Sequence, residues 1–307
     1  MNFIFKKKTP RPDFYRKNQK LLNGSWDFTY NFGQEDVGDI RPDFKINVPF
    51  CPESKLSGLE IDNEIIRSCY YRKHFSIRKD NDLLFLNFEA VNYLCNVYIN
   101  GQKVGEHRGG YTPFGFEISK YVKTGKNLLE VYCYSDVNDK NQPSGKQCDK
   151  LELYSVFYPR VTGIWQTVWL ERVPKTHIVN SFIDTSINGN VRFHLKTAGT
   201  PRSLSIEIFY KRKKIAFLKK SVDKNDIFVE IDIKSPLIWS GETPYLYDVK
   251  YILEDKKGIK DICFGYFGIR EIKTVGDKFL LNGKETFLNL VRRVLSLFQP
   301  AMRSTWP

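Results

Sequence analysis

The fold is decided by one stretch near the middle of the chain, Gly163-Ile164-Trp165-Gln166-Thr167-Val168-Trp169-Leu170-Glu171. Aromatic and β-branched side chains make up most of it, and such side chains pack well on the pleated surface of a sheet. Trp165 and Trp169 are four positions apart, so an extended strand places both on one face. The stretch therefore predicts a strand whose two tryptophans pack into a core.

Strand character recurs along the rest of the chain. Asn-Gly dipeptides at 100–101, 188–189 and 282–283 each separate two strand-like runs, and both residue types tolerate the positive φ angles of a tight hairpin turn. Apolar residues alternate along 204–210 and 228–233, which is typical of antiparallel strands with one buried face. Because no long amphipathic helix is evident, the sequence predicts an all-β protein.

The spacing of these runs predicts two β-sandwiches in series. After Pro174 the strand pattern restarts as about seven strands that end near Val275, which is the size of an immunoglobulin-like sandwich. The preceding part is too long for such a unit and suits a larger jelly roll. We therefore expect four regions, namely an N-terminal arm (1–17), a jelly-roll β-sandwich (18–174), an immunoglobulin-like β-sandwich (175–275) and a terminal segment (276–307).

Composition favours a folded protein with a solvated basic surface. The chain has 307 residues, of which 41% are hydrophobic, and a net charge of +13. Its basic residues are interspersed with 35 acidic ones, and the densest basic patch, 211–214, lies between two strand-like runs as a turn would. No nucleic-acid-binding motif accompanies the charge, so we expect no nucleic-acid partner. Salt-sensitive adhesion to an acidic surface remains an alternative.

Cysteine and histidine usage indicates neither a metal site nor a cofactor. The six cysteines include no C-x-x-C pair, and no histidine stands at metal-ligand spacing. Cys95, Cys133 and Cys263 fall inside apolar runs, where a free cysteine acts as a small buried hydrophobe. The first eight residues place charge after a short apolar stretch, the reverse of a signal peptide, and no run is long enough to span a membrane. We expect a cytoplasmic protein with no membrane partner.

Further motifs extend over most of the chain: 21–28 (LLNGSWDF), 48–50 (VPF), 70–75 (YYRKHF), 109–114 (GGYTPF), 145–147 (GKQ), 236–240 (PLIWS), 244–247 (PYLY), 267–270 (FGIR) and 279–284 (FLLNGK). Together with Gly163–Glu171 they resemble the N-terminal part of the family 2 glycoside hydrolases, the β-galactosidase and β-glucuronidase family. The resemblance implies a sugar-binding jelly roll, an immunoglobulin-like sandwich, and a hairpin at 279–284 that leads into a catalytic TIM barrel.

The resemblance also implies that this chain lacks the family's catalytic residues. It ends at Pro307, roughly where the family's barrel should begin, and residues 292–307 match no barrel segment. The family supplies both catalytic glutamates from that barrel, so we expect no catalytic residue here and no hydrolysis by this chain alone. The parent activity is expected to be hydrolysis of a β-galactoside or related glycoside. A shifted reading frame, a truncated gene and a naturally short protein all remain open.

Two residues are candidates for sugar contact. Asn92 aligns with an asparagine that some relatives extend toward sugar hydroxyls, and an amide can both donate to and accept from them. The alternative is that Asn92 closes a turn between two strands. Tyr158, in a loop, could stack on a sugar through its ring, as could Trp26 and Trp239. Carbohydrate is the expected partner, bound weakly because the sandwich would supply only one wall of a pocket.

Other candidate sites are less well supported by the sequence. Glu89, Glu152 and Glu171 lie beside strands or in loops without a paired carboxylate, and the four histidines have no matching nucleophile. Gly109-Gly110 lacks the Lys-Ser/Thr of a phosphate loop and is expected to be a turn. A scaffold role remains a third possibility, because sandwich surfaces that pack on the barrel in the family would be exposed here and could drive homo-oligomerisation.

Overall fold

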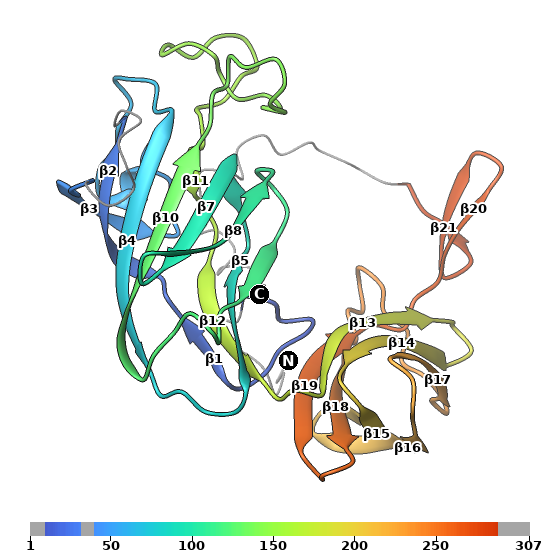
Figure 1. Cartoon of the computed structure of the whole chain (residues 1–307). Helices are drawn as coiled ribbons and strands as arrows, with labels where there is room; N and C mark the ends of the chain where they lie inside the picture. The colour runs from blue at the N-terminus through green and yellow to red at the C-terminus, as the bar shows by residue number, and fades with distance from the viewer. Residues whose placement is uncertain (1–9, 32–39, 288–307) are drawn as a thin grey trace. The chain divides into compact units, whose positions relative to one another are not determined.

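The computed structural model describes residues 10–31 and 40–287, which form two compact units (Figure 1). Residues 20–172 make up the first unit, and residues 10–19 join residues 173–287 in the second. The expectations for residues 1–9 and for the tail from 288 onward lie outside the described residues. Among the described residues, no helix is long and apolar enough to cross a membrane.

The first unit is the predicted jelly-roll sandwich. Its larger sheet has the strand order β3-β2-β4-β10-β7-β8, its smaller sheet the order β1-β12-β5-β9, and β11 pairs with β6 beside them. The larger sheet consists of β2 (Gly24–Tyr30), β3 (Phe44–Val48), β4 (Ser68–Ile77), β7 (Leu94–Ile99), β8 (Gln102–Arg108) and β10 (Gly125–Tyr134). The remaining elements are β1 (Gln19–Leu21), η1 (Lys55–Ser57), β5 (Leu83–Phe88), β6 (Val91–Asn92), β9 (Phe114–Glu117), β11 (Gly163–Ile164) and β12 (Val168–Val173).

Aromatic side chains fill much of the core of this unit. Trp26 and Phe28 on β2 are fully buried, and both contact the ring of Tyr71 on β4. The indole Nε1 of Trp26 donates to the carbonyl oxygen of Leu22 at 2.8 Å, so its one polar atom is satisfied. Because only 1% of Trp26 is exposed, the prediction that it could stack on a sugar is wrong.

The segment that decides the fold forms two short strands rather than one. β11 ends at Ile164, β12 begins at Val168, and Trp165 lies half-buried in the gap. Gly163, the first residue of β11, has a φ of +69° that is unfavourable for other residues, and an added Cβ would lie 2.3 Å from the Tyr71 hydroxyl. That hydroxyl accepts a bond from the Ile164 amide. Trp169 is 3% exposed and packs in the core as predicted.

The second unit is the predicted immunoglobulin-like sandwich. One sheet has the order β13-β14-β17 and the other the order β16-β15-β18-β19. These strands are β13 (His177–Thr185), β14 (Asn190–Ala198), β15 (Pro201–Tyr210), β16 (Lys213–Ser221), β17 (Asp226–Asp232), β18 (Tyr247–Asp255) and β19 (Lys260–Phe267). A small sheet follows, of β20 (Ile272–Val275), β21 (Lys278–Leu281) and β22 (Lys284–Glu285). Inward-facing apolar side chains alternate with outward-facing ones, for example along β17, where Ile227, Val229 and Ile231 are buried and the residues between them are exposed.

The residues before β1 pack on this second unit. Tyr15 exchanges two backbone hydrogen bonds with Phe264 on β19. Next to it, the guanidinium of Arg16 donates to both carboxylate oxygens of Asp261 at 2.8 Å, and both residues are at most 5% exposed. Asp261 also accepts from the Ile178 amide. This buried, hydrogen-bonded ion pair fixes the segment to β19 and β13.

Two of the Asn-Gly turns and the burial of the cysteines agree with the predictions from the sequence. Asn100-Gly101 and Asn282-Gly283 both have positive φ and join β7 to β8 and β21 to β22. The basic patch begins as the turn between β15 and β16, where Lys211 and Arg212 have positive φ. All six cysteines are free and buried, as the strand positions of Cys95, Cys133 and Cys263 predicted.

Candidate functional site

A set of buried side chains at one end of the jelly roll holds the long connection from β10 to β11. We call this set, Asn92 with Ser135, Gln142, Gln147 and Glu53, the polar network. Asn92 is 1% exposed, and its Nδ2 donates to the Val161 carbonyl oxygen at 2.5 Å and to the Ser135 hydroxyl at 3.3 Å. The Gln142 amide donates to the same hydroxyl at 2.9 Å. The network therefore ties the end of β6 to both ends of the connection.

Gln147 completes the attachment of Val161. Its Oε1 accepts from the Val161 amide at 2.7 Å, while its Nε2 donates to the Tyr111 hydroxyl at 3.1 Å. The backbone donor and acceptor of Val161 are thus both satisfied by side chains, from Gln147 and Asn92. Since Val161 lies outside any strand, these bonds take the place of a sheet ladder.

Glu53 binds the next residue of the connection. Its carboxylate accepts from both the amide and the hydroxyl of Thr162. Burial raises the pKa of the Glu53 carboxyl above its ordinary value of 4.5, and the bonds from Thr162 oppose that rise. The residue as a whole is half-buried, and its carboxylate lies beside the buried thiols of Cys51 and Cys69.

Aromatic rings form a partly exposed rim over the polar network. Tyr111 is 47% exposed and meets Trp165 edge-on with ring centroids 5.8 Å apart. The indole of Trp165 donates to the Gly110 carbonyl oxygen at 2.8 Å. Tyr158 is half-buried, its hydroxyl is hydrogen-bonded to that of Tyr111, and burial together with this neighbour raises the pKa of Tyr111. The predicted sugar contact Tyr158 therefore lies in a cluster with two further rings.

Asn92 is a residue of β6 whose side chain bonds to the distant Val161 and Ser135, and one of its atoms remains uncommitted. Its Nδ2 is used within the fold, whereas its Oδ1 has no hydrogen-bond partner among the described residues. That oxygen faces Gly110, where an added Cβ would lie only 2.5 Å from it. A buried acceptor without a partner costs about 1–3 kcal/mol, so Oδ1 is the atom of Asn92 whose bonding capacity the described residues leave unused.

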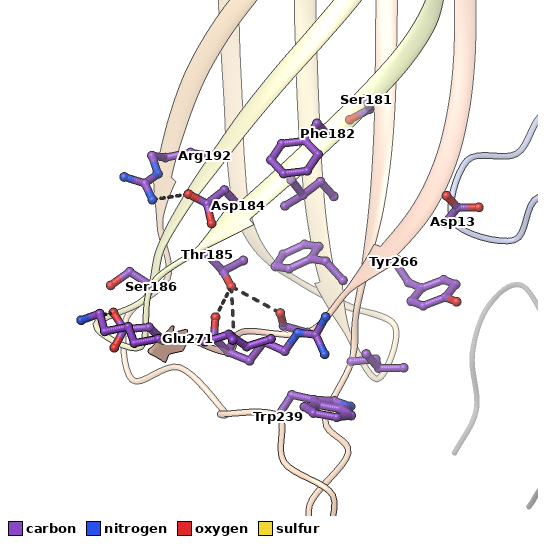
Figure 2. A pocket seen from close by; sticks show the side chains of 17 residues that line it. Asp13, Ser181, Phe182, Asp184, Thr185, Ser186, Arg192, Trp239, Tyr266 and Glu271 are labelled. Carbon is purple, nitrogen blue, oxygen red and sulfur yellow. Dashed lines mark hydrogen bonds and ion pairs between the residues drawn. The ribbon is translucent and has the colours of Figure 1, made fainter. Parts of the chain in front are cut away.

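Figure 2 shows a groove of about 1000 Å³ in the second unit, where β13 and β19 meet the linker to β20. The Thr185 hydroxyl accepts from the Arg270 amide and donates to the Arg270 carbonyl, which fixes that linker. Trp239 lies on the groove wall with the Arg270 guanidinium 5.2 Å from its ring centre. One ring face of this predicted stacking residue is therefore already covered.

Two ion pairs lie in the wall of this groove. Arg192 is bound to Asp184, and Lys273 to Glu271 at 2.9 Å. Among residues 10–31 and 40–287, no group of three or more histidine, cysteine or acidic side chains could hold a metal ion. These four charged side chains are therefore engaged with one another within the fold.

Several residues of the network were not found from the sequence. The GKQ and GGYTPF motifs pointed to Gln147 and Tyr111, but nothing marked Glu53, Ser135 or Gln142 as partners. Glu53 and Thr162 are 109 positions apart, so no local pattern connects them. Gly109-Gly110 is a bend, as predicted, and leads into β9.

Replacing Gly110 by alanine tests the contact with Asn92. The new Cβ would overlap Oδ1, so Gly110→Ala is expected to destabilise the jelly roll by about 1–3 kcal/mol in denaturant unfolding. Gly241→Ala is the matched control, because no heavy atom lies within 4 Å of its Cβ position. In an Asn92→Ala background, Gly110→Ala should lower the free energy of unfolding by less than it does in the wild type. An equal loss in both backgrounds would show that the destabilisation does not come from the contact with Oδ1.

A second prediction concerns pH and Glu53. A carboxyl with a raised folded-state pKa stabilises the fold fully below its unfolded value of 4.5 and loses that contribution as pH rises through the folded value. The stability of the wild type relative to Glu53→Gln should therefore fall from below pH 4.5 toward neutrality, measured by denaturant unfolding at each pH. Glu60→Gln, at an exposed position, is the control. A difference that is constant or grows with pH contradicts the assignment.

Comparisons with known proteins agree with this architecture. The family model "Glycosyl hydrolases family 2, sugar binding domain" matches residues 57–174, and "Glycosyl hydrolases family 2" matches residues 173–270. A β-galactosidase of Thermoanaerobacter pseudethanolicus is 31% identical over 240 residues, which are 73% of this chain and 31% of that protein. A β-galactosidase of Thermoanaerobacterium thermosulfurigenes is 29% identical over 292 residues, 89% of this chain and 40% of the relative.

Solved structures share the fold. The β-glucuronidase of Bifidobacterium dentium, complexed with coumarin-3-O-glucuronide, has a TM-score of 0.73 at 21% identity, covering 88% of this chain and 52% of the other. The β-D-glucuronidase of Dictyoglomus thermophilum has a TM-score of 0.68 at 23% identity, covering 89% and 47%. The chain thus spans less than two thirds of the length of these relatives. With both sandwiches matched in order, the chain belongs to family 2 of the glycosyl hydrolases, whose N-terminal domains it carries.

Proposed function

We propose that this chain is the non-catalytic N-terminal portion of a family 2 glycoside hydrolase and that its jelly roll contributes one wall of a carbohydrate site. In this proposal residues 18–174 are the sugar-binding domain and residues 175–275 the immunoglobulin-like spacer. Residues 276–307 begin with the hairpin that leads toward a catalytic domain. The match of residues 57–174 to the family's sugar-binding model supports the first assignment.

The observation that carries the proposal is the polar network beneath an aromatic rim. Tyr111 and Tyr158 are joined through their hydroxyls, and Gln147 anchors Tyr111 to the buried part of the network. Rings held in this way can stack on the apolar face of a sugar, while their hydroxyls and the uncommitted Oδ1 of Asn92 can bond to sugar hydroxyls. We assign sugar contact to Asn92 and Tyr158, with Tyr111 beside them.

The parent reaction is hydrolysis of an O-glycosidic bond, with a β-galactoside-like substrate as the first choice. The relatives at 29% and 31% identity are β-galactosidases, and the structural relatives are β-glucuronidases. Hydrolysis with retention needs two carboxylates about 5 Å apart, one as nucleophile and one as acid/base. We assign none of the described carboxylates to either role. Six buried free cysteines support a reducing, cytoplasmic setting.

Weak sugar binding without turnover is the expected behaviour of the purified chain. One wall of a site encloses little of a ligand, so calorimetry with galactose, glucuronate and short oligosaccharides should give dissociation constants on the order of 1 mM, about −4 kcal/mol. Tyr158→Ala and Asn92→Ala should weaken binding, while Phe217→Ala, at an exposed position of the second unit, should not.

Two results would contradict this proposal. If none of the sugars produces heat or perturbs the protein, the carbohydrate assignment fails. If the purified chain releases chromophore steadily from β-glycosides, and a protein preparation from cells lacking the gene does not, the non-catalytic assignment fails instead.

Association with another protein surface is a second candidate, favoured by one feature. The tip of the connection from β10 to β11 exposes Leu151, Leu153 and Val156 to 47%, 54% and 60%. Clustered exposed apolar side chains of this kind promote association.

Light scattering tests that second candidate. The wild type is expected to exceed the monomer mass at high concentration, and Leu153→Ser with Val156→Ser to reduce the excess, because burial of the two side chains drives the contact. A clean wild-type monomer at every concentration removes self-association from consideration.

A further inference from the structure

Three cysteines form a row across the larger sheet of the jelly roll. Cys133 on β10 lies directly opposite Cys69 on β4 and, on its other side, directly opposite Cys95 on β7. All three are at most 3% exposed and belong to the same core. Directly opposite residues on neighbouring strands point to the same face, so the three thiols are consecutive neighbours.

The two pairs differ in their position in the hydrogen-bond ladder. The Asn100 amide donates to the Leu128 carbonyl one position beyond the pair Ile99 and Leu129, which marks a hydrogen-bonded site between β7 and β10. Hydrogen-bonded and non-hydrogen-bonded pairs alternate along antiparallel strands. When the pairs are counted back along the register from Asn100 and Leu128, Cys95 and Cys133 fall on a non-hydrogen-bonded pair.

The neighbouring strand gives the same result independently. The Ser135 amide donates to the Arg67 carbonyl, one position beyond the pair Ser68 and Tyr134, so Cys133 and Cys69 form a hydrogen-bonded pair. The backbone of Cys133 therefore bonds toward β4 and turns away from β7. Cα atoms are about 4.5 Å apart in a non-hydrogen-bonded pair and about 5.5 Å in a hydrogen-bonded one, and side chains approach more closely in the former.

Side-chain contacts agree with this order. The thiols of Cys133 and Cys95 are hydrogen-bonded to each other. A disulfide requires Cβ atoms about 3.5–4.5 Å apart, a spacing that the closer pair approaches. Cys95 with Cys133 is thus the pair whose geometry fits a covalent bond with the smallest backbone movement.

We propose that Cys95 and Cys133 are a modification site, at which a two-electron oxidant such as hydrogen peroxide converts the buried thiol pair into a cross-strand disulfide. In the first step one sulfur attacks a peroxide oxygen, the O–O bond breaks, and a sulfenic acid and one water result. In the second step the other sulfur attacks the sulfenic sulfur, the S–O bond breaks and a second water leaves. Each cysteine loses one proton and one electron, and the peroxide accepts both protons and both electrons as it becomes two waters.

The reaction is slow in the folded protein. Burial raises the pKa of the Cys133 thiol, as the neighbouring Cys95 also does, so little of the reactive thiolate is present. The disulfide would join the strand that follows Asn92 to the strand that leads to Ser135. It would therefore link the two strands directly below the polar network.

The test treats the full chain with hydrogen peroxide, removes the oxidant with catalase, and unfolds the protein in N-ethylmaleimide before mass analysis. Two fewer cysteines than the six of the reduced protein should be alkylated, and a digest should contain one peptide pair that joins Cys95 to Cys133. Dithiothreitol should restore all six. In Cys95→Ala and in Cys133→Ala, oxidation should no longer reduce the number of alkylated cysteines. In Cys69→Ala, the matched variant of the neighbouring cysteine in the row, oxidation should still reduce that number by two.

Three outcomes would overturn the proposal. The first is that all six cysteines stay alkylatable after prolonged oxidation of the folded protein, the second is that the bond maps to Cys69, and the third is that oxygen atoms are added to the pair without a disulfide. Should an alanine variant fold poorly, the peptide map of the wild-type protein decides alone.

Discussion

The hydrogen bond from the Asn92 amide to the Val161 carbonyl oxygen is the contact on which the candidate site depends. The connection from β10 to β11 is long, and no strand of the two large sheets runs through it. A connection of this kind must find partners for its backbone groups elsewhere if its ends are buried. Asn92, Gln147 and Glu53 supply them for Val161 and Thr162. The aromatic rim keeps its position because the residues beneath it are held in this way.

The network also explains why polar residues lie inside a protein whose core is otherwise apolar. Each hydrogen bond contributes only about 0.5–1.5 kcal/mol net, but the loss of one partner leaves another buried group unsatisfied at a cost of about 1–3 kcal/mol. Ser135 is shared by Asn92 and Gln142, so its removal would leave the Gln142 Nε2 without its partner and take one of two acceptors from the Asn92 Nδ2. Shared members of this kind make a buried network rigid, and rigid support is what a binding rim needs.

Much of the fold could be predicted from the sequence because its signals are local. The Asn-Gly turns, the alternation along β15 and β17, and the restart of strands after Pro174 indicated two sandwiches, and the structure has both. The break at Trp165 could not be predicted, because the stretch carries no Gly, Pro or Asn-Gly turn signal between Ile164 and Val168. The close approach of Gly163 to the Tyr71 hydroxyl, about ninety residues away in sequence, is likewise not a local feature.

The candidate site was predictable only in part. The motifs that carry the family resemblance contain Gln147 and Tyr111, and Asn92 was singled out by alignment with an asparagine of relatives, yet neither signal says anything of burial. Trp26 illustrates the difficulty, since a tryptophan suited to stacking on a sugar is equally suited to a core, and here it is core. Glu53 carries no signal at all, because a buried carboxylate is recognisable only once its distant partners are in place.

Amide hydrogen exchange of Val161 and Thr162, read residue by residue in the native protein, tests most directly whether the network holds the connection. Both amides donate to side chains rather than to a neighbouring strand. The network predicts that they exchange as slowly as the amides of β12, although they lie outside any strand. Exchange as fast as that of the exposed tip at 151–156 would contradict it, because the connection would then open without breaking the fold.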